Sequence, residues 1–256
     1  MKNKDKAKKD QFIVGKRAVL EALRVQYPVK VLVIERSKAE NRDEIMRNIY
    51  RLAKRQDIKI LERDESWFRR RFHVLNPQGV VGVGDPYKFA EIEDIKIYKN
   101  STILLLDRIQ DPQNFGAIIR TAECVGISSI IIPEYGAADI TDTVISVSSG
   151  AIFHVKIAKV TNLVRAIDYL KKHNVWIVGT DPGAKTIYYD MDYKNLPFAI
   201  IMGNEGEGIR EGIRKKCDYL VSIPMRGKVS SLNVSVATGI VLFRLMEEKA
   251  KNSEYK

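Results

Sequence analysis

Cysteine and histidine are scarce in this sequence, with two cysteines and three histidines in 256 residues. Cys124 and Cys217 lie far apart without a paired spacing, and the histidines do not cluster. A disulfide framework and a zinc site therefore have no support, and we assign no metal ligands. We expect both cysteines to be buried as small apolar side chains. Single histidines are more often structural than catalytic, so we assign no histidine base.

Long apolar runs are also missing. The longest, such as residues 103–106 and 130–132, are too short to span a bilayer. No apolar signal segment follows the lysine-rich N-terminus. We therefore expect a cytoplasmic protein that does not act at a membrane. The 45% hydrophobic and 29% charged residues are typical of a globular protein, and 256 residues suffice for two domains.

Positive charge is abundant, and it is concentrated near the N-terminus. Residues 1–90 contain 22 Lys and Arg against 12 Asp and Glu, a net charge of +10, whereas the remainder contains 21 against 20, a net charge of +1. This asymmetry predicts an N-terminal part that binds a polyanion, with nucleic acid as the first candidate. The alternative is a basic surface that serves only solvation.

The basic part divides into an arm and a small domain. Residues 1–10 carry five lysines and almost no apolar side chain, which predicts a disordered arm. Residues 11–86 alternate apolar runs with helical patterns and predict a small α/β substrate-binding domain. Arginines beside Trp67 and Phe72 suit phosphate contact and base stacking, although the aromatic rings could equally be core. The candidate nucleic-acid contacts are Lys54, Arg55, Arg69, Arg70 and Arg71.

After a charged linker at 87–100, the α/β alternation resumes and continues through residues 101–256. Continuously apolar strands separated by helices predict a parallel sheet covered on both faces. We expect Asn114 to cap a helix that ends at Cys124. The five expected strands are 102–107, 129–133, 175–181, 198–203 and 219–224.

In such sheets a ligand binds at the carboxyl ends of the strands. Glycines and short polar residues concentrate in the loops that follow four of these strands, at 107–114, 179–183, 203–208 and 224–233. In the last loop Ser230, Ser231 and Asn233 precede a helix that we expect to begin near Leu232. An ordinary helix N-cap would need only one of them.

Three common site types do not match these loops. The glycines at 203, 206 and 208 do not have the spacing of a dinucleotide-binding loop. The segment at 179–186 has Ala184 where a P-loop needs glycine. No base for a serine nucleophile is evident beside Ser230 or Ser231.

Taken together, three of the loops resemble a known family. DPQNFGAIIRTAECVG (111–126), IMGNEGEGI (201–209) and IPMRGKVSSLNVSVATG (223–239) resemble the signature motifs of the SpoU-type, or TrmH-like, RNA 2'-O-ribose methyltransferases of the SPOUT superfamily. The match covers most of residues 100–246. The basic domain is similar to the ribosomal-protein-like RNA-binding domain of the bacterial 23S rRNA guanosine-2'-O-methyltransferases. It departs from that subgroup at Pro77, where an H-Q-G segment commonly has histidine.

The resemblance implies an enzyme that methylates a guanosine ribose in 23S rRNA or a large-subunit precursor. It also implies S-adenosylmethionine bound in a trefoil knot, and a homodimer. A tRNA or antibiotic-site rRNA 2'-O-methyltransferase is the alternative substrate class. A non-catalytic RNA-binding or ribosome-assembly factor is the alternative function class.

The resemblance also implies roles for individual residues. The catalytic positions are Asn114, Arg120, Glu205, Ser231 and Asn233, and the cofactor-binding positions are Thr180, Gly203, Ile223, Met225 and Leu232. Because guanidinium is always protonated, we expect Arg120 to hold a target phosphate or hydroxyl rather than act as a base. Asn114 as a simple helix cap, and Glu205 as a ligand of its own turn, are the structural alternatives.

Overall fold

A computed structural model describes residues 10–40, 43–73, 75–191, 196–204, 206–229 and 231–253. Most of the predicted arm, together with Glu205 and Ser230, lies outside the described residues. The chain forms two compact units. We call them the N-terminal unit (Met1–Lys88 with Ile140–His154) and the C-terminal unit (Phe89–Asp139 with Val155–Lys256). The domain boundaries predicted above stay a prediction.

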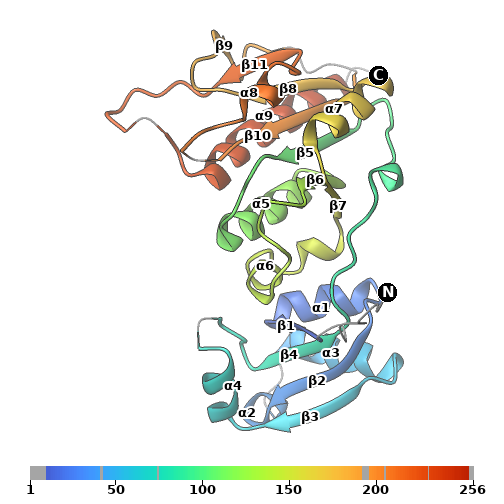
Figure 1. Cartoon of the computed structure of the whole chain (residues 1–256). Coiled ribbons are helices and arrows are strands. Elements are labelled where there is room, and N and C mark those ends of the chain that lie inside the picture. Colours follow the sequence, from blue (N-terminus) through green and yellow to red (C-terminus); the bar gives the residue numbers. More distant parts are fainter. Residues whose placement is uncertain are drawn as a thin grey trace, which may run out of the picture. The chain divides into compact units, whose positions relative to one another are not determined.

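The N-terminal unit contains a sheet with the strand order β1-β4-β2-β3, in which β2 and β3 are parallel and the other pairs antiparallel. Its strands are β1 (Gln11–Val14), β2 (Val29–Glu35), β3 (Lys59–Arg63) and β4 (Val80–Gly84). Its helices include α1 (Lys16–Arg24), α2 (Arg36–Glu40), α3 (Glu44–Arg55) and α4 (Glu65–Arg71) (Figure 1). The alternation of strands and helices agrees with the α/β pattern predicted from the sequence for residues 11–86.

The two faces of this sheet are covered by different helices. Side chains alternate along a strand, so Val33 of β2 points to one face and Ile34 to the other. Val33 packs with Phe68 and Phe72 of the α4 region, and both rings are buried. The core alternative was therefore right for Phe72. Ile34 is also buried, on the face where α1 and α3 contact each other.

A segment distant in sequence completes the N-terminal unit. Ile140–His154 contains α6 (Asp142–Val147) and the short 3-10 helix η2 (Ala151–Phe153). The Gln11 amide donates to the Ile140 carbonyl at 2.8 Å, and His154 Nε2 lies 2.9 Å from Glu21 Oε2. No pattern in the sequence indicates that these residues pack with the first strand and helix.

The C-terminal unit contains a seven-stranded sheet among the described residues, in the order β7-β6-β5-β10-β8-β11-β9, and every pair is parallel. The strands are β5 (Thr102–Leu106), β6 (Ser129–Pro133), β7 (Lys156–Val160), β8 (Trp176–Thr180), β9 (Thr186–Ile187), β10 (Phe198–Met202) and β11 (Tyr219–Ser222). The predicted α/β class with a parallel sheet is confirmed. The strands β7 and β9 were missed, and the trefoil knot stays a prediction.

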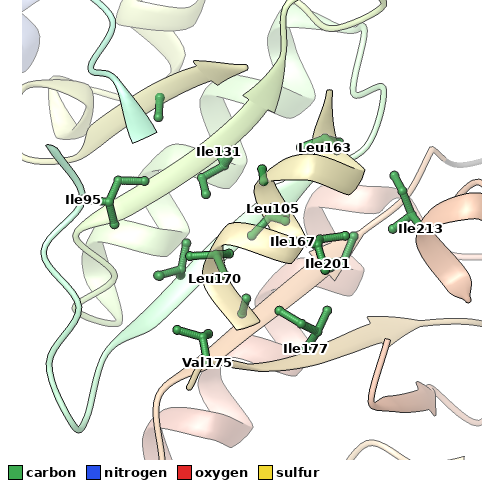
Figure 2. Close-up of a cluster of buried hydrophobic side chains, with 14 of the residues drawn as sticks. Ile95, Leu105, Ile131, Leu163, Ile167, Leu170, Val175, Ile177, Ile201 and Ile213 are labelled. Carbon is green, nitrogen blue, oxygen red and sulfur yellow. The ribbon is translucent and has the colours of Figure 1, made fainter. Parts of the chain in front are cut away.

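Helices cover both faces of this sheet. On one face α7 (Leu163–Lys172) packs Ile167 and Leu170 against Leu105, Ile131 and Ile201 (Figure 2). On the other face, α5 (Pro112–Cys124) contacts α9 (Val234–Ser253). The short helix α8 (Glu211–Arg214) precedes β11, and the 3-10 helix η1 (Ile92–Asp94) lies in the predicted linker.

Two local expectations, the Asn114 cap and the burial of Cys124, need correction. Helix α5 begins at Pro112 and is capped by Asp111, whose carboxylate accepts from the Gln113 N–H, so Asn114 is not the cap. Cys124 is exposed rather than buried, because it lies at the end of this helix. Ile95 in the predicted linker is only 4% exposed and belongs to the core of the C-terminal unit.

Neither a membrane-spanning helix nor a metal-binding cluster is present among the described residues. No helix there is long and apolar enough to cross a membrane. No group of three or more His, Cys, Asp and Glu side chains gathers there in a way that could hold a metal ion.

Candidate functional site

The C-terminal unit has a pocket of about 510 Å³ at the carboxyl ends of β8, β10 and β11. These strands are neighbours in the sheet, so their following loops converge at one edge. The start of α9 adds Val234 and Ala237 to the wall. This size is within the usual range for pockets that bind small molecules and cofactors.

All five predicted cofactor positions line this one pocket. Thr180 is the last residue of β8, Gly203 follows β10, Ile223 and Met225 follow β11, and Leu232 precedes α9. Ser231, a predicted catalytic residue, lines it as well. The structure thus brings together residues up to 52 positions apart, from 180 to 232. Their contact with a cofactor stays a prediction.

Residues 203–204 and 206–209 form one wall of the pocket, and the loop that contains them brings Gly203 and Gly208 into close contact. A Cβ atom on Gly203 would lie 2.1 Å from the carbonyl carbon of Gly208, which is impossible without moving backbone. The Asn204 N–H donates to the Gly208 carbonyl at 3.2 Å, and the Gly208 N–H donates back at 2.8 Å. Gly208 has φ +65°, a left-handed conformation that favours glycine.

This loop is fastened to the end of β5 by a buried carboxylate. Asp107 is 0% exposed and accepts from the backbone N–H of Arg210 at 2.9 Å. Its Oδ1 also accepts from the Arg210 side chain, with Nη2 at 2.7 Å and Nε at 2.9 Å. A buried carboxylate with several donors, one of them charged, is a strong tether. We call Asp107 and Arg210 the latch.

A second set of bonds joins the same two segments. Arg108 Nη1 pairs with Glu207 Oε2 at 2.6 Å, and the Asn204 amide donates to the Arg108 carbonyl at 3.2 Å. Arg108 has φ +62°, a strained conformation for a residue with a side chain. The sequence interpretation missed both Asp107 and Arg108. An acidic residue directly after a fully apolar strand was the available signal.

On the opposite wall Asp181 is held in place by a basic residue. Its carboxylate accepts from Arg214 Nε at 2.5 Å and from the Gly183 N–H at 2.7 Å. The Asp181 carboxylate raises the pKa of the Arg214 guanidinium above its ordinary value. Behind the wall, burial raises the pKa of the Cys217 thiol to about 11, which disfavours a reactive thiolate there.

Two of the predicted catalytic residues, Asn114 and Asn233, are hydrogen-bonded to each other. The Asn233 amide nitrogen donates to Asn114 Oδ1 at 2.8 Å, although the residues are 119 positions apart. Asn233 Oδ1 accepts from the Ser235 N–H at 2.9 Å, so Asn233 caps α9. The helix begins at Val234, two residues later than expected. Because Asp111 caps α5, the Asn114 side chain is available for this bond.

The remaining predicted catalytic residues are placed differently. Arg120 lies on α5 and is exposed, while its neighbours Ile118 and Ile119 are 0% exposed. Arg120 is not among the residues that line the pocket. Glu205 lies outside the described residues.

The predicted nucleic-acid contacts fall on two helices of the N-terminal unit. Lys54 and Arg55 end α3, whereas Arg69, Arg70 and Arg71 end α4, and all five are exposed. The two helices cover opposite faces of the sheet, so the structure does not bring the five residues together. The Arg71 guanidinium lies 4.7 Å from the centre of the Phe12 ring.

Comparison with family models gives two matches that together cover most of the chain. Residues 101–243 match the SpoU rRNA Methylase family, and residues 12–90 match the family described as RNA 2'-O ribose methyltransferase substrate binding.

Individual relatives agree with these matches. YacO of Bacillus subtilis (strain 168), whose name assigns it to the TrmH family of tRNA/rRNA methyltransferases, is 35% identical over 248 residues, which cover 93% of this chain and 96% of YacO. An AdoMet-bound rRNA methyltransferase from Sinorhizobium meliloti is 29% identical with a TM-score of 0.79, over 93% of this chain and 87% of that one. The SpoU methyltransferase AviRb from Streptomyces viridochromogenes has the same fold, with a TM-score of 0.81 at 24% identity over 98% and 94% of the two chains.

Proposed function

The chain belongs to the SpoU rRNA methylase family of RNA 2'-O-methyltransferases, and from this premise we propose its substrate, its cofactor site and the roles of its residues. The proposed reaction is the transfer of a methyl group from S-adenosylmethionine to the ribose 2'-hydroxyl of a guanosine in 23S rRNA. The observation that carries the proposal is the single pocket lined by all five predicted cofactor positions.

The pocket suits S-adenosylmethionine in size and in chemistry. Its volume of about 510 Å³ can hold a nucleoside with an amino-acid chain. Ile209, Ile223 and Leu232 offer an apolar surface for adenine, and Asp181 offers a carboxylate for a cationic group. When bound, S-adenosylmethionine supplies an electrophilic methyl group on a sulfonium ion.

In this proposal the protein acts mainly by positioning. The latch and the Asn114–Asn233 bond hold the loops around the pocket before any ligand binds, which reduces the reorganisation that reaction requires. Arg120 binds the target phosphate or hydroxyl, and Ser231, Glu205 and Asn233 fix the loop and the ribose. The implied homodimer and trefoil knot belong to the same proposal.

The experiment is methyl transfer from labelled S-adenosylmethionine to deproteinised rRNA and, separately, to tRNA. Incorporation into one guanosine ribose of 23S rRNA is the expected result. Methylation of tRNA alone would show that tRNA, and not rRNA, is the substrate. The name of YacO, which includes both tRNA and rRNA, favours testing both. Tight RNA binding without any incorporation would instead favour a non-catalytic RNA-binding or assembly factor.

The role of Arg120 has its own test. Lysine keeps the charge but not the planar fork of donors, so Arg120→Lys should reduce turnover on bound RNA by about a hundredfold. Arg165→Lys, an exposed arginine of α7 outside the pocket lining, is the matched control and should retain activity. Near-normal turnover of Arg120→Lys would contradict the proposed role.

A further inference from the structure

The N-terminal unit has a pocket of its own, with a volume of about 920 Å³. It is formed by the end of β2, by α2 and α4, and by the segment 75–79. The apolar residues of its lining include the partly exposed Leu75 and Pro77, together with Phe68 and Phe72, which are only 3% and 6% exposed. Both phenylalanines are anchored in the core of the unit, so this surface is rigid.

Several polar groups around this surface are without a partner. Among the described residues, Lys38, the His73 ring and the Gln78 side chain have no recorded hydrogen bond or ion pair, and all three are exposed. Asn76 uses its oxygen to accept from the Gln78 N–H at 3.2 Å, which leaves its amide nitrogen available. Convergent polar groups around an apolar surface are characteristic of a ligand site.

The backbone fixes the shape of this pocket at Gly79. Its φ of +81° favours glycine, and a Cβ there would lie 2.6 Å from Cγ of Lys38. The Glu35 N–H donates to the Gly79 carbonyl at 2.9 Å. The end of β2 and the segment 75–79 are therefore held in close contact.

The charges indicate what kind of ligand fits. Lys38 and Arg69 can bind phosphate, while the carboxylates of Glu35 and Glu65 would repel a polyphosphate. Arg69 pairs with Glu65 at 2.6 Å, but both side chains are largely exposed. Such an exposed ion pair contributes little free energy, so Arg69 can leave Glu65 to bind a phosphate. A single nucleotide fits both the positive and the negative groups of the pocket. Its phosphate can lie near the cations, and the edge of its base can lie near a carboxylate or amide.

Guanine matches this arrangement best among the bases. Its Watson–Crick edge carries adjacent N1–H and N2–H donors that one carboxylate can accept together. Glu35 is a lining residue of the pocket, and its Oε1 also accepts from the Ser37 hydroxyl. Proteins read single-stranded RNA through such edges, combined with contacts to the base faces. We propose that this pocket binds one unpaired guanosine of the RNA substrate, distinct from the nucleotide that is methylated. The inference rests on the proposed function.

Fluorescence anisotropy with the full chain tests the inference. The probes are labelled uridine nonamers with G, A, C or U at the central position. The nonamer with guanosine should bind roughly tenfold more tightly than the others, the discrimination expected of one good bidentate contact. Glu35→Gln and Gln78→Ala should remove this preference without weakening binding of the all-uridine nonamer. Circular dichroism melting confirms that each variant is folded.

Lys54→Ala is the matched control, because Lys54 is a basic residue of α3 outside this pocket. It should weaken binding of all four nonamers equally and keep the preference for guanosine. Equal binding of the four nonamers by the wild type, a preference that survives Glu35→Gln, or no binding at all would overturn the inference.

The methyl-transfer assay separates the two proposals. A guanosine preference without methylation of any RNA would contradict the proposed function and leave the guanosine pocket in place. Methylation without a guanosine preference would support the proposed function and contradict the guanosine pocket.

Discussion

The pocket of the C-terminal unit and the pocket of the N-terminal unit described above differ in how their polar groups are used. In the C-terminal unit, Asp107 and Arg210 are bonded to each other, as are Asn114 and Asn233. In the N-terminal unit, Lys38, His73 and Gln78 have no recorded partner within the described ranges. The first arrangement suits a small ligand that must be held in one geometry. The second suits a macromolecule that supplies the missing partners itself.

The largest expected effect is a break in the geometry of the C-terminal pocket. Gly203→Ala places a methyl group on the backbone of Gly208, so the turn must open. We expect the unfolding free energy to fall by about 4 kcal/mol, and binding of S-adenosylmethionine in calorimetry to be lost.

Gly206→Ala is the control for this change. The nearest atom to its added Cβ is Asn204 Oδ1 at 3.6 Å, so stability should change by less than about 0.5 kcal/mol. Equal effects of the two substitutions would show that close packing at Gly203 does not define the pocket.

The next effect concerns the latch. Asp107→Ala leaves Arg210 and its backbone N–H without their acceptor and should cost about 3 kcal/mol in chemical denaturation. It should also weaken binding of S-adenosylmethionine, while RNA affinity stays unchanged.

Asp168→Ala is matched to Asp107→Ala, because Asp168 pairs with Lys216 at 2.7 Å but both side chains are over 40% exposed. Removing this pair should cost less than about 1 kcal/mol and leave cofactor affinity intact. A loss of RNA affinity in Asp107→Ala would mean that the two functions are not separated as described.

The smallest effect is a dependence of stability on pH, and it differs between the units. Burial lowers the pKa of Lys249 in the C-terminal unit to about 8. In the N-terminal unit, the hydrogen bonds from Lys30 to Asp10 and Asp85 raise the pKa of Lys30 to about 12. Between pH 8 and the ordinary lysine value of 10.5, Lys249, unlike Lys30, binds fewer protons in the folded state than in the unfolded state.

Stability that depends on Lys249 should therefore rise as the pH increases from 8 to 10.5. The comparison is the melting temperature of the wild type and Lys249→Met across this window. The wild type should gain about 3 °C relative to the variant. Parallel curves would show that burial of Lys249 has no effect on stability.

The sequence predicted local structure well, because local patterns determine it. The apolar runs marked β5 and β10, and glycines with short polar residues marked the loops around the C-terminal pocket. The cofactor positions came from the family resemblance, and the structure adds that they share one cavity.

Contacts between distant residues could not be predicted. The latch joins Asp107 to Arg210 across 103 positions, and each residue alone is an ordinary charged residue in a loop. The packing of Ile140–His154 with α1 also has no local signature, although the segment lies inside the range that matches the methylase family. Asn114 was misread as a cap because Asp111, three residues earlier, can serve equally well.

Steady-state methyl transfer to rRNA tests the separation of the two pockets most directly, with Gln78→Ala and Asp107→Ala compared in one assay. We predict that Gln78→Ala raises KM for RNA and leaves KM for S-adenosylmethionine unchanged. Asp107→Ala should raise KM for S-adenosylmethionine and leave KM for RNA unchanged. If either substitution raised both constants to the same extent, the division between an open RNA pocket and a preformed cofactor pocket would be wrong.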